Sequence, residues 1–464
     1  MYRTRQIIIR KGHRFFQYCK EICQSSASLY NRANYLIRQY ATALTRNEQG
    51  EELTQNQKDA VELIRCATEE TRYAPKGKWL TYGQLDYVLK ATRDAAYFHL
   101  PAQANQQILK RILRDYKSFF EAVKVYTDTK EIFTGRPGMP GYRKKGSMIT
   151  AVLTNQICRI KEEKYLRFPG TGEKINIGKL AGDVRLKEVR IKPHADCFVL
   201  DIVLEITEDE AIENAGNNKL CLMEQEELKK HLAVQNECHY RVAAIDPGTN
   251  NFCAVTNNFG KQPFLIRGGI IKSENRYYNK TLARLKSEAK RCNGVFSTKR
   301  ISRLHDKRNR RIRDWMHKIS RMIVRWAQEN QVEVIVMGHN AFQKQKIDIG
   351  HTNNQNFVQI PFAVFAGMLR YKLNEKGIAF LETEESYTSK ADFLAKDPIP
   401  EYKKDRKAIT MSGTRIHRGL YEHGNGRISN ADINGAANIL RKVFPNVTEW
   451  DSGVVDTPYA VRIA

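Results

Sequence analysis

The sequence has no long apolar run. No stretch of about 18 apolar residues occurs in it, so it offers no segment long enough to cross a bilayer as a helix. Its first residues, MYRTRQIIIRKGHRFF, also contain no apolar core of the kind that secretory signal peptides carry. We therefore expect no membrane partner and a cytoplasmic location.

Cysteine pairs are also absent. The nine cysteines are scattered and none forms a CxxC pair, while the spacing of Cys19 and Cys23, one helical turn, favours core packing over metal ligation. A disulfide framework is therefore not expected, which fits a reducing cytoplasm. Because no cysteine follows Cys292, a zinc ribbon in the last third is excluded and no structural zinc is expected.

Acidic residues are too few to balance the basic ones. Lys and Arg together number 77 against 51 Asp and Glu, which gives a formal net charge of +26. Self-repulsion of this size destabilises a compact protein, so the charge indicates a large polyanionic partner, and nucleic acid is the first candidate. The 464 residues are enough for two or three domains with their own cores.

Hydrophobic periodicity changes along the chain and predicts its division into parts. The expected parts, in chain order, are a first β-strand (1–12), a helical region (13–126), the remainder of a small antiparallel β-domain (127–207), an acidic linker with one short helix (208–239), an α/β domain (240–444) and a loose tail (445–464). The first strand is expected to join the sheet of the small β-domain, which makes the helical region an insertion.

Two basic clusters are candidates for nucleic-acid contact. The first follows a break rich in Gly and Pro, and the second lies on a predicted helix. A run of charge often only solvates a surface, but eight cations in fifteen residues with one acid, Asp306, repel one another unless phosphates neutralise them. The candidate residues are Tyr142, Arg143, Lys144 and Lys145 in the first cluster, and Lys299, Arg300, Arg303, Lys307, Arg308, Arg310, Arg311 and Arg313 in the second.

The stretch RVAAIDPGTNNFCAVT (241–256) predicts a β-hairpin. An apolar strand ends on Asp246, a turn follows at Pro247 to Asn250, and a second apolar strand begins near Phe252. A carboxylate at the end of a buried strand needs a positive partner, and since the turn has no Lys or Arg, a metal ion is one candidate. The alternative is that Asp246 serves only the chemistry of the turn.

The elements after this hairpin are predicted to follow the order of an RNase H-like domain: a third strand at 264–269, a long helix, a strand at 332–338, a helix at 356–377, a strand at 378–390 and a last helix at 430–444. In that fold carboxylates from two strands and the last helix converge and hold two divalent cations roughly 3.5–4 Å apart. Ligands that are all oxygen suit Mg²⁺ or Mn²⁺.

Several motifs in this order resemble the TnpB family, whose members are transposon-encoded, RNA-guided DNA nucleases related to type V CRISPR effectors. They are GRPGMPGYRKK, IDPGTNN, NQNFVQIPF, EESYTSKADF, RIHRGLY and NADINGAANI. The resemblance implies a RuvC-like nuclease domain after a wedge-type β-domain that a helical recognition lobe interrupts. It also implies a guide RNA and a target double-stranded DNA as partners and a prokaryotic host, while the oligomeric state stays unknown. Asp246 and Asp432 match the family's first and third catalytic acids.

The second acid departs from the family pattern. Many TnpB proteins have Glu on the strand that corresponds to VIVMG, where this chain has Met337 and Gly338. Glu385 resembles the relocated acid of one branch of the family and is our expected third ligand. Glu384 and Glu382 remain alternatives, although both point to the opposite face if the strand is regular, and a site without a catalytic Glu is also open.

The family's zinc ribbon is missing too, and a basic loop is expected in its place. Its Arg415 and Arg418 are predicted to position the scissile strand or support the site, or else only to fix the loop to the last helix. The leading hypothesis is a Mg²⁺-dependent, RNA-guided DNA endonuclease. The alternatives are an RNA-guided DNA-binding protein whose nuclease site has decayed, and a DDE-type transposase, which shares the fold and the metals.

Overall fold

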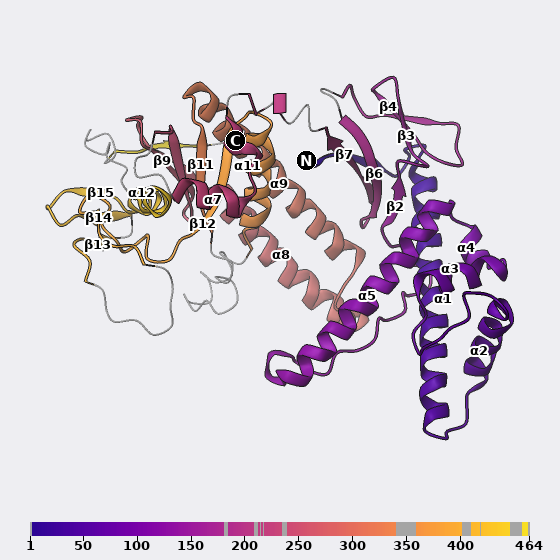
Figure 1. The fold of residues 1–464 in the computed structure, drawn as a ribbon. Coiled ribbons are helices and arrows are strands. Elements are labelled where there is room, and N and C mark those ends of the chain that lie inside the picture. The colour runs from indigo at the N-terminus through magenta and orange to yellow at the C-terminus, as the bar shows by residue number, and fades with distance from the viewer. Residues whose placement is uncertain are drawn as a thin grey trace. The chain divides into compact units, whose positions relative to one another are not determined.

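The computed structural model describes residues 2–180, 184–207, 212–213, 215–216, 218–233, 239–339, 359–400, 410–417, 419–445 and 457–462. The chain forms two compact units, Met1–Thr207 and Glu208–Ala464, whose elements are shown in Figure 1. Both units combine helices with β-sheets, so the expected α/β multidomain class is confirmed. No helix among the described residues is both long and apolar enough to cross a membrane.

The first unit contains a four-stranded antiparallel sheet in the order β1-β7-β6-β2. Its strands are β1 (Tyr2–Arg10), β2 (Ala151–Thr154), β6 (Val184–Pro193) and β7 (Cys197–Ile206). The pairing of β1 with β7 joins the start of the unit to its end, so the N-terminal strand does belong to this sheet. A second, smaller sheet is formed by β3 (Arg159–Lys161), β4 (Tyr165–Arg167) and β5 (Lys174–Asn176).

Helices between β1 and β2 share one core with these sheets. They are α1 (Phe16–Glu48), α2 (Gln55–Thr68), α3 (Tyr82–Ala91), α4 (Ala95–Phe98), α5 (Ala102–Asp128) and the short 3-10 helix η1 (Lys130–Ile132). The buried side of α5 includes Ile108, Ile112 and Tyr116. The Tyr116 hydroxyl donates to Asn34 Oδ1 at 2.7 Å, which satisfies both polar groups inside the helical core.

The second unit is built on a mixed sheet in the order β12-β11-β8-β9-β10-β16. Strands β8, β9 and β10 are antiparallel, while β11 runs parallel to β8, and β12 runs parallel to β11. This is the strand order expected of an RNase H-like domain. The strands are β8 (Val242–Pro247), β9 (Asn251–Asn257), β10 (Phe264–Arg267), β11 (Val334–His339), β12 (Ala379–Glu384) and β16 (Tyr459–Val461).

Helices cover both faces of this sheet, as Figure 1 shows. Ala243 and Ile245 of β8 pack in one cluster with α9 and α11, whereas Val242 and Ala244 pack in another with α7 and α12. Burial on both faces explains why β8 reads as a continuous apolar run instead of an alternating one. The helices are α7 (Gln225–Ala233), α8 (Gly269–Asn293), α9 (Lys299–Glu329), α11 (Phe362–Asn374) and α12 (Ala431–Val443).

Two segments of the second unit are packed more closely than the sequence indicated. The acidic segment expected to be a linker packs on the sheet from residue 218: Leu228 and Leu232 of α7 are buried, and Gln225 Nε2 donates to the backbone carbonyl of Phe380. The short 3-10 helix η2 (Lys219–Leu222) precedes it. The expected loose tail contains β16, which pairs with the edge strand β10. The short helix expected in the acidic segment is α7, whereas β16 has too few residues to show a period.

Candidate active site

Asp246 lies at the end of β8 on the face that α12 covers. It shares this face with Val242 and Ala244 because side chains alternate along a strand. Helix α12 approaches it closely at Gly435, where a Cβ atom would lie 2.5 Å from Asp246 Oδ2. The missing side chain at Gly435 therefore lets the helix sit close to the sheet and leaves room for the carboxylate itself.

Glu385 follows the last residue of β12 and lies beside β11. A Cβ atom at Gly338 would stand 3.0 Å from Glu385 Oε2 and 3.4 Å from Glu385 Cβ. Val334 and Val336 pack on the α12 side of β11, so Gly338 belongs to that side as well. The Glu385 carboxylate thus occupies the space into which a side chain at position 338 would project.

The other two glutamates of this segment have different partners. Glu382 forms an ion pair with Arg370 of α11, on the opposite face, as the alternation predicts. Glu384 does not share that environment: it pairs with Lys442 Nζ of α12 at 2.5 Å and accepts a hydrogen bond from the Ser386 amide. The regular-strand expectation fails for Glu384 because β12 ends there and the chain turns. Lys442, the partner of Glu384, is separated from Asp432 by roughly 15 Å along α12, at 1.5 Å per residue.

Asp432 is fixed at the N-terminus of α12. The Asn430 side chain caps this helix and accepts from the Asp432 amide at 3.0 Å, as the sequence predicts. The carboxylate Oδ2 accepts a hydrogen bond from Asn251 Nδ2 at 2.7 Å, and Asn251 Oδ1 in turn accepts from Arg267 at 3.2 Å. Arg415 approaches Asp432 Oδ1 to 3.6 Å. Asn251 closes the motif IDPGTNN, but the sequence assigned it no role, and Arg267 lies in no motif.

Two of the predicted acids, Glu385 and Asp432, act electrostatically on the third, Asp246. Burial raises the pKa of Asp246 well above its ordinary value, the charges of Glu385 and Asp432 raise it further, and Arg415 opposes the rise. A divalent cation would relieve this repulsion, and oxygen donors suit Mg²⁺ or Mn²⁺. The donor chemistry therefore fits such an ion. The positions are not those of a closed ligand set, since the described residues contain no group of three His, Cys, Asp or Glu placed to hold a metal.

A cavity of about 660 Å³ opens beside Asp432. Its lining includes Asn251, Arg267 and Arg415, together with the turn between β8 and β9, and it does not include Asp246 or Glu385. Two guanidinium groups from distant parts of the chain thus border a space next to one of the acids. Such a space has the polarity to accept an anionic group such as a phosphodiester.

The segment expected to be a basic loop folds as a small antiparallel sheet. It consists of β13 (Thr414–His417), β14 (Leu420–Glu422) and β15 (Ile428–Asn430), and β13 carries Arg415. Arg418 lies outside the described residues. The sheet escaped prediction because its strands have three or four residues each and β13 is exposed along its whole length, so no apolar alternation marks it.

A buried polar network holds this small sheet in place. His423 Nδ1 lies 2.6 Å from Asp392 Oδ1 and His423 Nε2 lies 2.8 Å from Ser429 Oγ. Burial alone would raise the pKa of Asp392, but hydrogen bonds from Gly424, His423 and Ala395 outweigh it and the pKa is lowered. An ionised carboxylate only accepts, so Nδ1 is the donor. Ser429 is 1% exposed, so this Ser-His-Asp arrangement is structural and not nucleophilic.

The first basic cluster is partly engaged inside its own unit. The Arg143 guanidinium lies 4.5 Å from the centre of the Tyr30 ring, and the Arg143 amide donates to Asn31 Oδ1 at 2.7 Å. Tyr142, Lys144 and Lys145 are exposed. Arg143 is therefore committed to packing, whereas its three neighbours face solvent.

The second cluster forms a basic stripe along α9. We use "basic stripe" for the exposed residues Lys299, Arg300, Arg303, Lys307, Arg310 and Arg311. They lie on the side opposite the buried Ile301 and Ile312, and Arg313 is exposed beside them. Arg308 is different: its guanidinium bonds to Asn275 Oδ1 at 2.7 Å and to the Gln359 carbonyl. The helix turns Arg308 towards α8 and leaves it half-buried, and its predicted contact with nucleic acid stays a prediction.

Comparison with known proteins supports the resemblance noted from the sequence. Residues 223–343 match the model of the OrfB_IS605 family, described as a probable transposase, which confirms the resemblance to the TnpB family over that segment. The segment includes Asp246 and the basic stripe, but neither Glu385 nor Asp432. No curated protein matches the chain.

Solved structures of RNA-guided effectors are also similar to this chain. A Cas12f1–sgRNA–target DNA complex has 14% sequence identity, with 94% of this chain and 98% of that chain covered and a TM-score of 0.30. The mini RNA-guided endonuclease CRISPR-Cas_phi3 has 10% identity, with 96% and 92% covered and a TM-score of 0.40.

The close approach at Gly435 gives a first prediction. We expect Gly435→Ala to lower the free energy of unfolding by about 1–3 kcal/mol, because the added methyl group overlaps the Asp246 carboxylate. The control is Gly367→Ala in α11, where a Cβ atom meets nothing within 4 Å; it should raise stability by about 0.5–1 kcal/mol. Urea titrations measure both. Equal effects of the two substitutions would contradict the contact.

The buried network gives a second prediction. Asp392→Ala should lower the free energy of unfolding by about 3–5 kcal/mol at neutral pH, because it leaves His423 and the Gly424 amide without their buried acceptor. The folded pKa of Asp392 is lowered, so its contribution is complete above the ordinary Asp range and is lost as the pH falls through the lowered pKa.

Urea titrations at a series of pH values test this dependence. The difference between Asp392→Ala and the unmodified protein should shrink on acidification. The control Asp314→Ala removes a carboxylate that is 70% exposed and should change stability by less than about 1 kcal/mol. If Asp392→Ala lowers the free energy of unfolding by the same amount at every pH, the charge of Asp392 does not contribute to the stability of the network.

Proposed function

We propose that the protein is an RNA-guided DNA endonuclease that hydrolyses phosphodiesters at a RuvC-like site and acts in the cytoplasm of a prokaryote. One observation carries the proposal: Asp246, Glu385 and Asp432, which are distant in sequence, gather at one edge of a sheet with RNase H-like order. The family match over residues 223–343 and the net charge of +26 support it. Guide RNA and target double-stranded DNA are the proposed partners.

Asp246, Glu385 and Asp432 would hold Mg²⁺ or Mn²⁺, which at such a site polarises a phosphate and lowers the pKa of an attacking water. The protein's own contribution is position. Asn251 holds one oxygen of Asp432 by a 2.7 Å hydrogen bond, and the absence of side chains at Gly435 and Gly338 leaves room for the other two carboxylates. Arg415 lies close to Asp432, and this proximity supports the proposal that it binds a phosphate of the cleaved strand.

The basic stripe is proposed to bind the nucleic-acid backbone. From Lys299 to Arg311 the helix rises roughly 18 Å at 1.5 Å per residue, which is long enough to meet several phosphates of one strand. Arg308 remains a candidate for the same role, although its guanidinium also bonds to Asn275 and Gln359. Tyr142, Lys144 and Lys145 in the first unit, and Arg418, remain candidates for the same partner.

A second candidate function is RNA-guided DNA binding without cleavage. The observation that favours it is the orientation of Asp432 towards Asn251 and Arg415, together with the lack of a closed ligand set among the described residues. A third candidate, a DDE-type transposase, takes its support from the description of the matching family as a probable transposase. It requires strand transfer without RNA.

The acids give the main test. Asp246→Asn, Glu385→Gln and Asp432→Asn should each slow Mg²⁺-dependent cleavage of guide-matched DNA by about 10³-fold or more, while guide and target binding stay within about threefold. The matched control is Glu382→Gln, whose carboxylate pairs with Arg370 on the other face and which should cleave normally.

The three candidate functions give different results in these assays. Cleavage by Asp246→Asn at the unmodified rate would refute the endonuclease proposal. Binding without cleavage by every form, including the unmodified protein, would identify the decayed site. Joining of DNA ends without any RNA would identify the transposase.

The contact between Glu385 and Gly338 gives a separate prediction. Glu385→Ala should abolish cleavage, and adding Gly338→Glu should restore part of it, since the new carboxylate enters the space that Glu385 leaves. Ile439→Val is included in both forms because a Cβ atom at 338 would lie 2.6 Å from Ile439 Cδ1. Single-turnover cleavage rates at saturating guide RNA measure this recovery. If the added glutamate gives no gain over Glu385→Ala, the two positions do not serve one role.

A further inference from the structure

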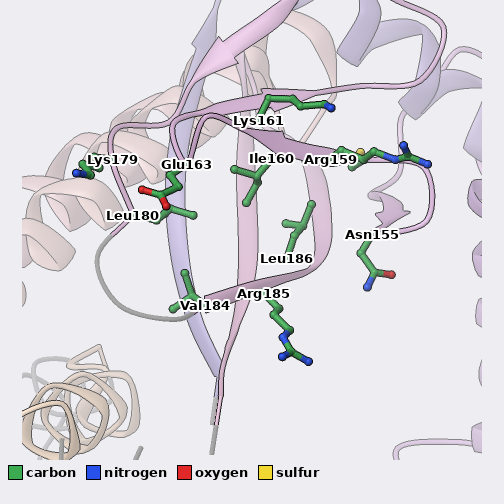
Figure 2. A pocket seen from close by; sticks show the side chains of 11 residues that line it. Asn155, Arg159, Ile160, Lys161, Glu163, Lys179, Leu180, Val184, Arg185 and Leu186 are labelled. Carbon is green, nitrogen blue, oxygen red and sulfur yellow. The ribbon is translucent and has the colours of Figure 1, made fainter. Parts of the chain in front are cut away.

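The first unit contains an open cavity of about 970 Å³ between the β3-β4-β5 sheet and the first residues of β6. Figure 2 shows four aliphatic side chains in its middle, from Ile160, Leu180, Val184 and Leu186. All four are partly buried and pack against the core of the unit. They form an apolar floor, which is our name for these four residues, and the volume falls in the range of clefts that bind small ligands.

Hydrogen bonds fix the frame of this cavity. The Leu180 amide donates to the Glu163 carbonyl at 3.0 Å and the Ile177 amide to the Lys164 carbonyl at 2.8 Å. Arg5 of β1 donates to the Ile177 carbonyl at 2.6 Å. Three separate parts of the chain are therefore tied together around the floor, so that the cavity is a built feature of the unit.

Cations surround the floor. Arg159, Lys161, Lys179 and Arg185 lie around it in Figure 2, and all four are exposed. None of them forms an ion pair with another residue that the structure describes, and the lining includes one acid, Glu163. We call these four residues the cationic rim. An anion would relieve the mutual repulsion of these cations, and an apolar group would cover the floor. A matching ligand therefore has both an anionic part and an apolar part.

We propose that this cavity binds an unpaired nucleotide of the guide RNA, with the base on the apolar floor and the adjoining phosphates on the cationic rim. The inference rests on the proposed RNA partner. A paired base has its faces covered by its neighbours in the stack, so a duplex reaches the rim but not the floor. Structured RNA has loops and bulges whose bases are free to leave the stack, and apolar side chains accept such bases.

The test uses the full-length protein in EDTA, so that it needs neither metal nor cleavage. The probes are a fluorescein-labelled single-stranded oligouridylate and an abasic oligonucleotide of the same length and charge. The unmodified protein should bind the oligouridylate roughly tenfold or more tightly than the abasic probe, because only the former has bases that bury apolar surface on the floor. Leu186→Glu, which places a charge on the floor, should remove this preference, and the control Leu186→Met should keep it.

A second measurement locates the bound base even if Leu186→Glu fails to fold. Irradiation of the unmodified protein with an oligonucleotide that contains a diazirine-modified uridine, whose carbene inserts into aliphatic C–H bonds, should give adducts at the floor residues Ile160, Leu180, Val184 or Leu186. Adducts confined to other segments, equal binding of the two probes, or capture of phosphatidylserine vesicles in preference to the oligouridylate would each overturn the inference. Because these measurements are made in EDTA and detect binding alone, loss of the base preference and loss of cleavage are separate results, so a failure of this cavity and a failure of the nuclease proposal are distinguishable.

Discussion

Repulsion among three carboxylates is the constraint on which the second unit depends. Asp246, Glu385 and Asp432 are close enough to raise the pKa of Asp246, and nothing in their own chemistry keeps them together. Packing does so: β8 is buried on both faces, and α12 is pressed against it by Ile433, Ala436 and their neighbours. The free energy of a large apolar core is thus used to hold like charges near one another.

Positioning of the acids is distributed over several kinds of interaction. A glycine in α12 and a glycine in β11 provide space, an asparagine provides a hydrogen bond, and a small sheet delivers Arg415. The small sheet in turn depends on a buried Asp392, His423 and Ser429 network. Groups that touch no proposed ligand therefore determine where charged groups stand at the site, as hydrogen-bonded supporting residues do in many catalytic centres.

Much of the fold was predictable because apolar runs are strong signals. The buried strands of the second unit and the position of Asp246 at the end of one of them followed from such runs, and the N-cap at Asn430 followed from helix chemistry. The resemblance to a family, and not periodicity, selected Glu385. Its role and those of Asp246 and Asp432 stay predictions, although the structure brings the three together.

Other features have no such signal. The strands β13 to β15 and β16 have three or four residues each, too few for a period. A short helix was expected where α7 lies, but its two glutamates and two lysines gave no sign that Leu228 and Leu232 are buried. Arg308 belongs by sequence to the second basic cluster, but the phase of the helix turns it towards α8 and away from the basic stripe. Asn251 and Arg267 meet Asp432 only through the tertiary fold.

The pairing of β1 with β7 has a consequence for synthesis. Gln6 of β1 bonds to Asp201 of β7, which is 195 residues later, so the first strand leaves the ribosome roughly 10–40 s before its partner at about 5–20 residues per second. During that interval its backbone edge has no strand to bind. Arg3 and Arg5 precede the apolar run of this strand, and Arg10 follows it. Charges on an unpaired strand disfavour its association with other nascent chains.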